Sequence, residues 1–229
     1  MWQRLNWDKF LDGFFQSKCL LCKRSTPDRI CLDCDRQINS CRYPQFHQPL
    51  ASHAAPMLFS WGVYDGALKR AIAACKYDRH RDIATLLGMR MGQVWQQDIV
   101  AQRIFNSCNR LSVIPIPLHA QRQKERGFNQ AEVLARSFCL EVGCRCFPHA
   151  LSRIKNTKPQ IQTKSKQERE TNLERAFAVG QVSELSQSVI LLDDIYTSGA
   201  TVHEAIASLK TSGISVRAVV VLAKPKFGV

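Results

Sequence analysis

The chain has 229 residues, of which 45% are hydrophobic, and it carries a formal net charge of +13 with a pI near 9.5. This length can bury one full core and still carry a small appendage, so we expect two unequal domains. The positive charge favours phosphate-rich ligands, nucleic acid or an acidic protein partner, although a solvated basic surface explains it equally well.

Neither a secretory signal nor a membrane span is expected. The first residues, Met-Trp-Gln-Arg-Leu-Asn-Trp, contain no uninterrupted apolar core and no small-residue cleavage site. No window approaches the apolar length that a span requires. We therefore expect a cytoplasmic protein without a membrane partner. In that reducing compartment, paired clusters among its ten cysteines favour metal ligands over disulfides.

The amino-terminal part predicts a small metal-binding module at residues 1–43. Apolar residues recur at three- and four-residue spacing over 7–15 and predict a short amphipathic helix. Two Cys-x-x-Cys pairs follow, separated by eight residues. Together they supply the four thiolates of a structural zinc site, whereas two redox pairs or two chance clusters explain the paired spacing less well. The predicted Zn²⁺ ligands are Cys19, Cys22, Cys31 and Cys34.

Residues 44–56 lack periodicity and predict a connector. It contains His47 and His53, which we interpret as solvent-exposed rather than as ligands because four cysteines already complete the zinc set.

From residue 57 onward, short apolar runs alternate with helical periodicity, as in an α/β domain with a parallel sheet. Strands are predicted at 57–64, 111–116, 189–192 and 215–222, and helices at 65–77, 83–95, 131–142 and from about residue 200. In the first of these helices we expect Lys69, Arg70 and Lys76 to point outward. Gly88 and Gly92 argue against a straight second helix, and 122–128 is interpreted as a basic loop.

The stretch 189–201, Val-Ile-Leu-Leu-Asp-Asp-Ile-Tyr-Thr-Ser-Gly-Ala-Thr, predicts a buried strand, a loop and the start of a helix. Ligands of open α/β sheets bind at the carboxyl ends of strands, where Asp193 and Asp194 can accept hydrogen bonds from ribose hydroxyls. An ordinary βα turn is the alternative, and a Walker loop is excluded because the Gly-Lys-Ser/Thr ending is missing. The predicted phosphate-binding residues are Thr197, Ser198, Gly199, Ala200 and Thr201.

This stretch resembles the phosphoribosyl pyrophosphate (PRPP) motif of type I phosphoribosyltransferases. Upstream, Pro115-Ile-Pro-Leu-His119 and Arg126-Gly-Phe-Asn-Gln130 resemble the pyrophosphate-loop region of glutamine PRPP amidotransferases and, more closely, the ComF (GntX-like) family of competence-associated proteins. That family has the same order of parts, with a Cys₄ pair, a segment like Tyr64-Asp-Gly66, the Arg-Gly-Phe-Asn-Gln element and the PRPP motif. The resemblance covers almost the whole chain and implies a type I phosphoribosyltransferase-like domain at 57–229.

Displacement at C1 of PRPP would proceed through a cationic sugar, with Mg²⁺ and cationic side chains neutralising the leaving pyrophosphate. The predicted catalytic residues are therefore Asp193 and Asp194, which would orient and stabilise the ribose. For the pyrophosphate end and a hood over it, the candidates are Arg126, Lys155 and Arg169. The last two lie in the basic segment 151–177, for which a solvated loop is the alternative interpretation.

Two functions stay open at this point. In the first, the resemblance to ComF implies a cytoplasmic factor of natural transformation that assists uptake or handling of incoming single-stranded DNA, through a DNA helicase partner, and uses the transferase fold to bind PRPP or a ribose 5-phosphate-like ligand. In the second, the chain is a working phosphoribosyltransferase of nucleotide or salvage metabolism. The zinc module and the lack of an identifiable base pocket favour the first; the acidic pair and phosphate loop favour the second. We rank the competence role first and leave catalysis open.

Overall fold

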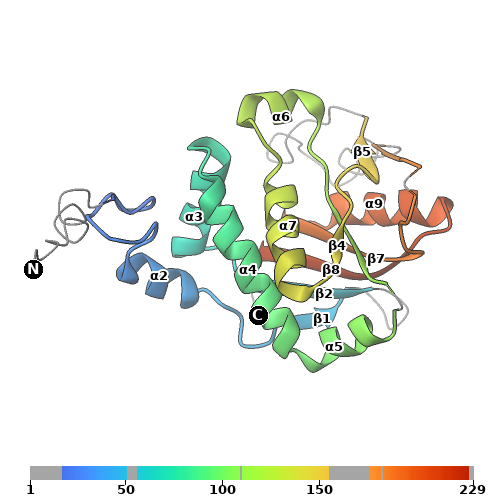
Figure 1. Cartoon of the computed structure of the whole chain (residues 1–229), viewed down its shortest axis with the longest axis horizontal. Helices are drawn as coiled ribbons and strands as arrows, with labels where there is room; N and C mark the ends of the chain where they lie inside the picture. The colour runs from blue at the N-terminus through green and yellow to red at the C-terminus, as the bar shows by residue number, and fades with distance from the viewer. Residues whose placement is uncertain (1–16, 51–55, 109, 155–175, 182, 227–229) are drawn as a thin grey trace, which may run out of the picture.

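The computed structural model describes residues 17–50, 56–108, 110–154, 176–181 and 183–226 (Figure 1). The predicted amphipathic helix at 7–15, the histidine at 53, and the predicted cations Lys155 and Arg169 lie outside these ranges. In the described part of the chain, no helix is both long and apolar enough to cross a membrane.

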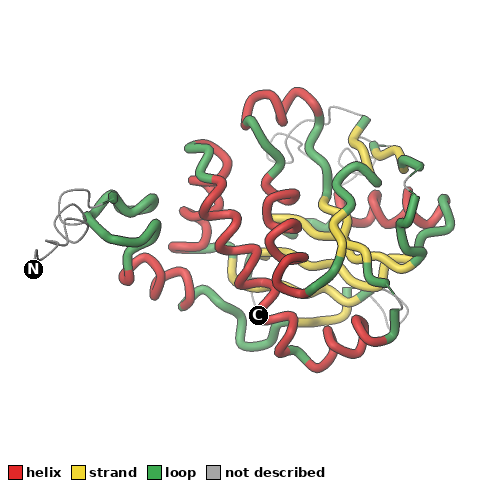
Figure 2. Tube along the Cα trace, viewed as in Figure 1, coloured by secondary structure: helices red, strands yellow, loops and turns green. Residues whose placement is uncertain are grey.

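A six-stranded, mostly parallel sheet forms the centre of the molecule (Figure 2). Its strand order is β1-β2-β8-β7-β3-β4, and only the edge pair β1–β2 is antiparallel. The four predicted strands are present. The bounds are His47–Pro49 for β1, Met57–Val63 for β2, Ser112–Pro115 for β3, Arg145–Cys146 for β4, Ser188–Ile195 for β7 and Ser215–Lys224 for β8.

Helices cover both faces of this sheet. One face carries the larger core, to which α3, α4 and α7 contribute, and the other carries a smaller core with α9 and a two-stranded sheet, β5–β6. The bounds are Leu32–Asn39 for α2, Gly66–Tyr77 for α3, Arg81–Gln97 for α4, Ile99–Asn106 for α5, Ala120–Arg126 for α6, Gln130–Val142 for α7, Leu151–Arg153 for β5, Phe177–Val179 for β6 and Ala200–Thr211 for α9.

Strand β7 is central and is buried on both faces. Ile190 and Leu192 belong to the larger core, Val189 and Leu191 belong to the smaller one, and all four side chains are inaccessible to solvent. Because successive side chains of a strand point to opposite faces, an unbroken apolar run is what a doubly covered strand requires. The prediction of a central strand at 189–192 is confirmed.

The chain reverses its direction of travel across the sheet between β3 and β7. Strand β3 is followed by α6 and α7 and then by β4 on one side, whereas β7 is followed by α9 and then by β8 on the other. At such a reversal the two connections leave the sheet on opposite faces and open a crevice outside the carboxyl ends of the strands. The rule therefore directs attention to the end of β7, where Asp193 and Asp194 are.

Three expectations about local structure are wrong. The segment predicted as a basic loop at 122–128 mostly forms α6, which begins after His119 and ends at Gly127, whose φ is 81°. Helix α4 is continuous, because Gly88 and Gly92 serve close packing on α7: a Cβ at Gly88 would lie 2.4 Å from the Leu134 carbonyl oxygen. In the predicted connector, β1 carries His47, which is largely buried and whose Nδ1 lies 2.7 Å from Asp98 Oδ2.

Candidate functional site

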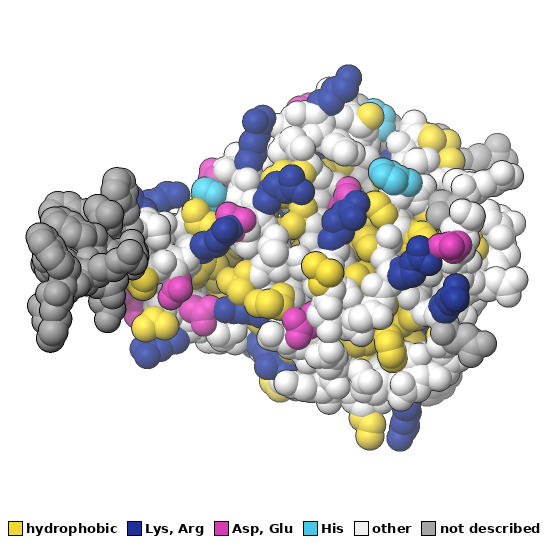
Figure 3. All heavy atoms as spheres, in the orientation of Figure 1, with side chains coloured by type: hydrophobic (Ala, Val, Ile, Leu, Met, Phe, Trp, Pro, Cys, Tyr) yellow, Lys and Arg dark blue, Asp and Glu magenta, His cyan; other side chains and the backbone are white. Residues whose placement is uncertain are grey.

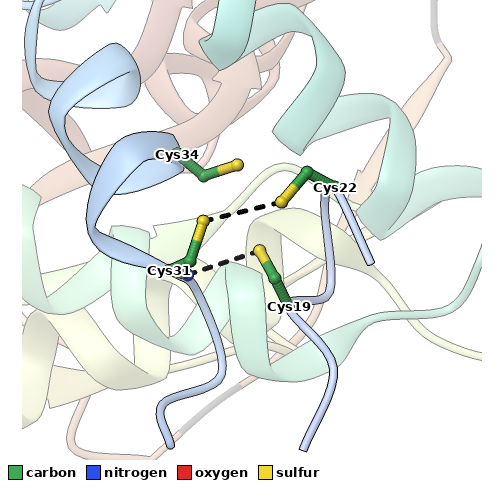
Figure 4. A group of neighbouring side chains, drawn as sticks. All are labelled: Cys19, Cys22, Cys31 and Cys34. Carbon is green, nitrogen blue, oxygen red and sulfur yellow. Dashed lines mark hydrogen bonds between the residues drawn. The ribbon is translucent and has the colours of Figure 1, made fainter. Parts of the chain in front are cut away.

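Four cysteine sulfur atoms converge beside α2 (Figure 4). Cys19 and Cys22 lie on a tight turn in which Cys19 and Arg24 are joined by a backbone hydrogen bond of 2.8 Å, while Cys31 and Cys34 lie at the start of α2. The four sulfur atoms all lie within 4.8 Å of one another. Tetrahedral zinc–sulfur bonds of about 2.3 Å would place sulfur atoms about 3.8 Å apart, so the set is close enough to hold one metal ion.

Backbone N–H groups make this cluster suitable for negative sulfur. Burial opposes ionisation of Cys19, but N–H donors, including that of Cys22 and the Cys31 N–H at 3.3 Å from the sulfur, lower the pKa of Cys19 to about 6. Cys34 is the opposite case, because its burial and its contacts with the other thiols raise its pKa. A bound cation is the chemical group that would allow all four sulfurs to be thiolates together.

The second cluster is the acidic pair at the end of β7. Asp193 Oδ1 accepts a hydrogen bond of 2.8 Å from the Asp194 N–H, and Asp194 Oδ2 lies 2.6 Å from Lys76 Nζ. The side chains of Lys76 and Asp194 are only 16% and 15% exposed, so this ion pair is shielded from solvent. Burial opposes the charge of Lys76, but Asp194 and Asp193 raise its pKa, which keeps the ammonium charged.

Asp193 differs from its neighbour in electrostatics. Burial, followed by the negative charge of Asp194, raises the pKa of Asp193 to about 8, although the Asp194 N–H and Lys76 oppose the shift. Two adjacent carboxyls thus divide into one that pairs with Lys76 and one that holds a proton near neutral pH. Such a pair can both accept from and donate to the hydroxyl groups of a sugar.

The loop after β7 places hydroxyl groups at the start of α9. Thr197 and Ser198 are exposed, Thr201 is half-buried, and Gly199 and Ala200 form the transition into the helix. Position 199 requires glycine, because its backbone φ is 76° and a Cβ there would lie 2.2 Å from the Tyr196 hydroxyl oxygen. The expected strand-loop-helix geometry is present. The Ala200 N–H lies 3.5 Å from Ser198 Oγ, and N–H groups of a first helical turn, which lack an acceptor within the helix, are the kind that can bind an anion.

Cationic side chains surround the acidic pair. Arg126, at the end of α6, interacts electrostatically with Lys76 and Arg122, while Arg153 of β5 interacts with Asp193 and Arg122. Arg126 was predicted from the sequence, whereas Lys76, Arg122 and Arg153 were missed. The expectation that Lys76 points outward is wrong, since it lies over the acidic pair. Its position four residues after the buried Ile72, at the border of the apolar face of α3, was the available signal.

The fold and the two clusters define an α/β protein with a group of acidic and cationic side chains at the switch point of its sheet, preceded by a Cys₄ group whose sulfur atoms are close enough to hold a metal ion.

Three curated proteins are similar to this chain. No family model matches the chain. Competence protein ComFC of Bacillus subtilis is 41% identical over 101 residues, which are 44% of this chain and 39% of that protein. Competence protein F of Haemophilus influenzae is 26% identical over 224 residues, covering 88% of this chain and 94% of that protein. DNA utilization protein YhgH of Salmonella typhimurium is 25% identical over 202 residues, covering 85% of each. These similarities support the resemblance to the ComF family.

The raised pKa of Asp193 predicts a pH-dependent stability. Between about pH 4 and pH 8, the folded state holds a proton on Asp193 that the unfolded carboxyl, with an ordinary pKa of 3.8, has lost. The free energy of unfolding should therefore fall as the pH rises through this window, and the contribution of Asp193 should be flat outside it. Asp193→Asn should remove this dependence and stabilise the protein at pH 8 by at least about 1 kcal/mol, the value of roughly one pKa unit.

Urea unfolding of both proteins across this pH range measures the effect. Asp82→Asn is the control, because Asp82 is an exposed partner of Arg29 far from β7 in the sequence, and it should leave the slope unchanged. A slope that survives Asp193→Asn would contradict the assignment of the proton to this carboxyl.

Proposed function

We propose that the chain is a cytoplasmic factor of natural transformation that handles incoming DNA and binds PRPP, or a related ribose 5-phosphate ligand, on a type I phosphoribosyltransferase-like domain. The observation that carries the ligand proposal is the acidic pair Asp193–Asp194 with Lys76 at the switch point, directly before a hydroxyl-rich loop that opens α9. The competence role is supported by the names of the relatives, two of which are competence proteins and one a DNA utilization protein.

In this proposal, different structural elements bind different parts of the ligand. Asp193 and Asp194 bind the ribose hydroxyls, while the loop 197–201 and the first turn of α9 bind the 5-phosphate. Arg126 interacts electrostatically with Lys76 and Arg122, and Arg122 interacts with Arg153; in the proposal these cations would meet the pyrophosphate. Mg²⁺ that arrives with PRPP would supply further neutralisation of the pyrophosphate charge.

Strands β5 and β6, which flank the predicted hood in the sequence, pair antiparallel, with Leu151 opposite Val179 and Arg153 opposite Phe177. Arg153 interacts electrostatically with Asp193, which supports a hood near the proposed site. We include Lys155 and Arg169 of this segment in the proposal as cations that close over the pyrophosphate.

Nucleic acid is the second proposed partner. Lys and Arg side chains are distributed over the face shown in Figure 3, interspersed with fewer acidic groups, consistent with the net charge of +13. Such a surface attracts a phosphate backbone without reading its sequence, and the affinity falls steeply with salt. A DNA helicase would present the single strand to this surface.

The Cys₄ group is proposed to hold one structural Zn²⁺ in a module spanning 1–43, followed by a connector at 44–56 and the ligand-binding domain at 57–229. The supporting observations are the mutual approach of the four sulfurs and the N–H donors directed at Cys19. The described part of the module has little core of its own beyond Cys19, Ile30, Cys34 and Ile38, so bound metal would contribute directly to its folding.

A working phosphoribosyltransferase of nucleotide or salvage metabolism is the second candidate. The observation that favours it is the raised pKa of Asp193 beside the Asp194–Lys76 ion pair, because a scaffold used only for structure gains nothing from two largely buried neighbouring carboxyls.

PRPP with Mg²⁺ should bind the purified protein, and Asp194→Asn should weaken the affinity at least tenfold, or about 1.4 kcal/mol, because it removes an anionic ribose acceptor and leaves Lys76 unpaired. Isothermal titration calorimetry measures both, with Asp82→Asn as a control that binds normally. Absence of binding of PRPP and of ribose 5-phosphate at millimolar concentration would exclude the ligand proposal and, with it, the enzyme alternative.

Zinc should be present at a stoichiometry near one, and Cys22→Ser or Cys34→Ser should lose it because three thiolates no longer close the tetrahedron. Cys41→Ser is the matched control: its sulfur bonds the Gln37 and Asp65 carbonyl oxygens and lies outside the four-sulfur group. Elemental analysis of the three variants decides the assignment, and a full zinc content in Cys22→Ser would refute it.

Deletion of the gene should lower transformation by exogenous DNA after uptake, while growth on rich medium stays near normal. The wild-type gene and Asp82→Asn should restore transformation; Asp194→Asn should not. A deletion strain that transforms normally but requires a purine, a pyrimidine or another nucleotide precursor would replace the competence role with the salvage enzyme.

A further inference from the structure

Three further cysteines gather where α7 ends and β4 begins. Cys139 lies in the last turns of α7, Cys144 follows the helix, and Cys146 lies on β4 at the edge of the sheet. Cys139 is only 5% exposed, whereas the other two are partly exposed. All three pack in the larger core, and neither the acidic pair nor the Cys₄ group uses them. We call them the α7 cysteine cluster.

The end of α7 turns the chain back toward Cys139. Gly143 has a φ of 77°, and the N–H groups of Gly143 and Cys144 both donate to the Cys139 carbonyl oxygen, at 2.9 and 3.1 Å. A helix that ends at a left-handed glycine commonly brings the side chain after the glycine into contact with the last helical turns. The position of Cys144 beside Cys139 follows from this helix end.

The register of β4 directs Cys146 to the same place. Cys146 is paired with Val113 of β3, and it packs against the larger core, which α7 also covers. The next residue, Phe147, belongs to the smaller core on the opposite face. Because successive side chains of a strand alternate between the faces, Cys146 faces α7. Its sulfur there interacts with the thiol of Cys139.

The sulfurs of this cluster differ in their readiness to ionise. Interactions with Cys144 and Cys146, followed by burial, raise the pKa of Cys139, which keeps it a neutral thiol. Hydrogen bonding from Cys139 and the positive charge of Arg136 lower the pKa of Cys146, against the opposing effects of burial and of Glu132. A partly exposed cysteine beside a cation and a thiol donor has the environment of a reactive thiolate.

A metal ion shared by all three sulfurs does not fit this arrangement. In the part of the chain that the structure describes, the Cys₄ group is the one set of metal ligands whose atoms all lie within 4.8 Å of one another. The α7 cysteine cluster does not meet that distance as a set of three. A disulfide requires the approach of only two sulfurs, and Cys139 interacts with each of the others.

We propose that Cys146 and Cys139 form a reversible redox-active pair, in which Cys146 reacts with a low-molecular-weight disulfide and Cys139 completes an internal disulfide. The Cys146 thiolate attacks one sulfur of the small disulfide, which forms a mixed disulfide and releases one thiolate. Cys139 then gives its proton to water and attacks the Cys146 sulfur, which releases the second thiolate. Two protein thiols are oxidised to one disulfide, and the small disulfide is reduced to two thiols.

The internal disulfide would fasten the end of α7 to the edge strand β4, and a reducing dithiol would open it again. Transient disulfides of this kind are the ones that occur in reducing compartments, where permanent ones are rare. The proposal requires neither PRPP nor nucleic acid, and it is independent of the metal assigned to the Cys₄ group.

Peptide mapping of the oxidised protein tests the pair. The full-length protein, as purified, is incubated with oxidised glutathione, free thiols are blocked with N-ethylmaleimide, and the protein is digested with trypsin. Trypsin separates the proposed partners because it cleaves after Arg145. Cys146 then lies on the peptide 146–153, and the other two cysteines lie on the peptide 137–145. We expect these two peptides to be joined by a disulfide, with Cys144 blocked by the reagent, and dithiothreitol to separate them.

Cysteine variants identify the two sulfurs. Cys146→Ala and Cys139→Ala should each abolish the joined peptide, whereas Cys144→Ala should retain it. Thermal unfolding establishes which variants are folded. Cys146 is partly exposed on a short edge strand, so its variant tests the pair even where replacement of the buried Cys139 prevents folding. Cys41→Ser is the matched control, since Cys41 is a partly exposed cysteine outside both clusters, and it should retain the joined peptide.

Three outcomes would overturn the proposal. The first is the absence of a joined peptide at millimolar oxidised glutathione. The second is a disulfide contained within the peptide 137–145, which would assign the bond to Cys139 and Cys144. The third is oxidation confined to the Cys₄ group, seen as loss of its metal while Cys139 and Cys146 are both blocked by the reagent. Calorimetry with PRPP tests the ligand proposal separately, so failure of either leaves the other standing.

Discussion

The constraint on which the site depends is the placement of two adjacent carboxyls at the end of a strand buried on both faces. Leaving one carboxylate there without compensation would cost several kcal/mol, and two would repel each other. The molecule meets this cost in two ways. Lys76 neutralises Asp194 from above the sheet, and Asp193 retains its proton. The elements that bring cationic side chains to this edge of the sheet, namely α3, α6 and β5, meet this need to compensate negative charge.

Much of this arrangement could be predicted from local sequence. Strand β7 and helix α9 were visible because four apolar residues, two carboxylates and a hydroxyl-rich turn follow one another without interruption. The Cys₄ cluster was visible because metal ligands need a fixed spacing, and the structure brings the four sulfurs together. Helix α7 was predicted from the periodic spacing of its apolar residues, and these residues form its buried face in the structure. In each case the signal lay within sixteen consecutive residues or fewer, the longest being Cys19 to Cys34.

The parts that sequence reasoning missed depend on partners distant in the chain. Helix α6 has no buried residue, so its sequence shows no hydrophobic periodicity. It is stabilised by residues of high helix propensity and by the glycine that follows its last turn. Lys76 was assigned to solvent because its partner Asp194 lies on a different element: the helical pattern places Lys76 at the border of the apolar face of α3 but does not show what it contacts. The helix at 83–95 was predicted, but its glycines weighed against a straight helix because their intrinsic propensity was considered without the close neighbour, α7, that requires them.

The Cys₄ segment and the acidic pair are connected through α3. Arg70 of α3 donates to Gln37 of α2 at 2.8 Å, and Arg90 of α4 forms an ion pair with Asp35 of α2. Cys34 and Ile38 of α2 belong to the same core as Leu68 and Ile72 of α3. Helix α3 begins at the Asp65 cap and ends one residue beyond Lys76, so the helix that contacts the Cys₄ segment also delivers the cation to Asp194. The Cys₄ segment has little core of its own, so its stability depends on the sulfur cluster. Because this segment packs on α3, the stability of the cluster also contributes to the position of Lys76 over the acidic pair.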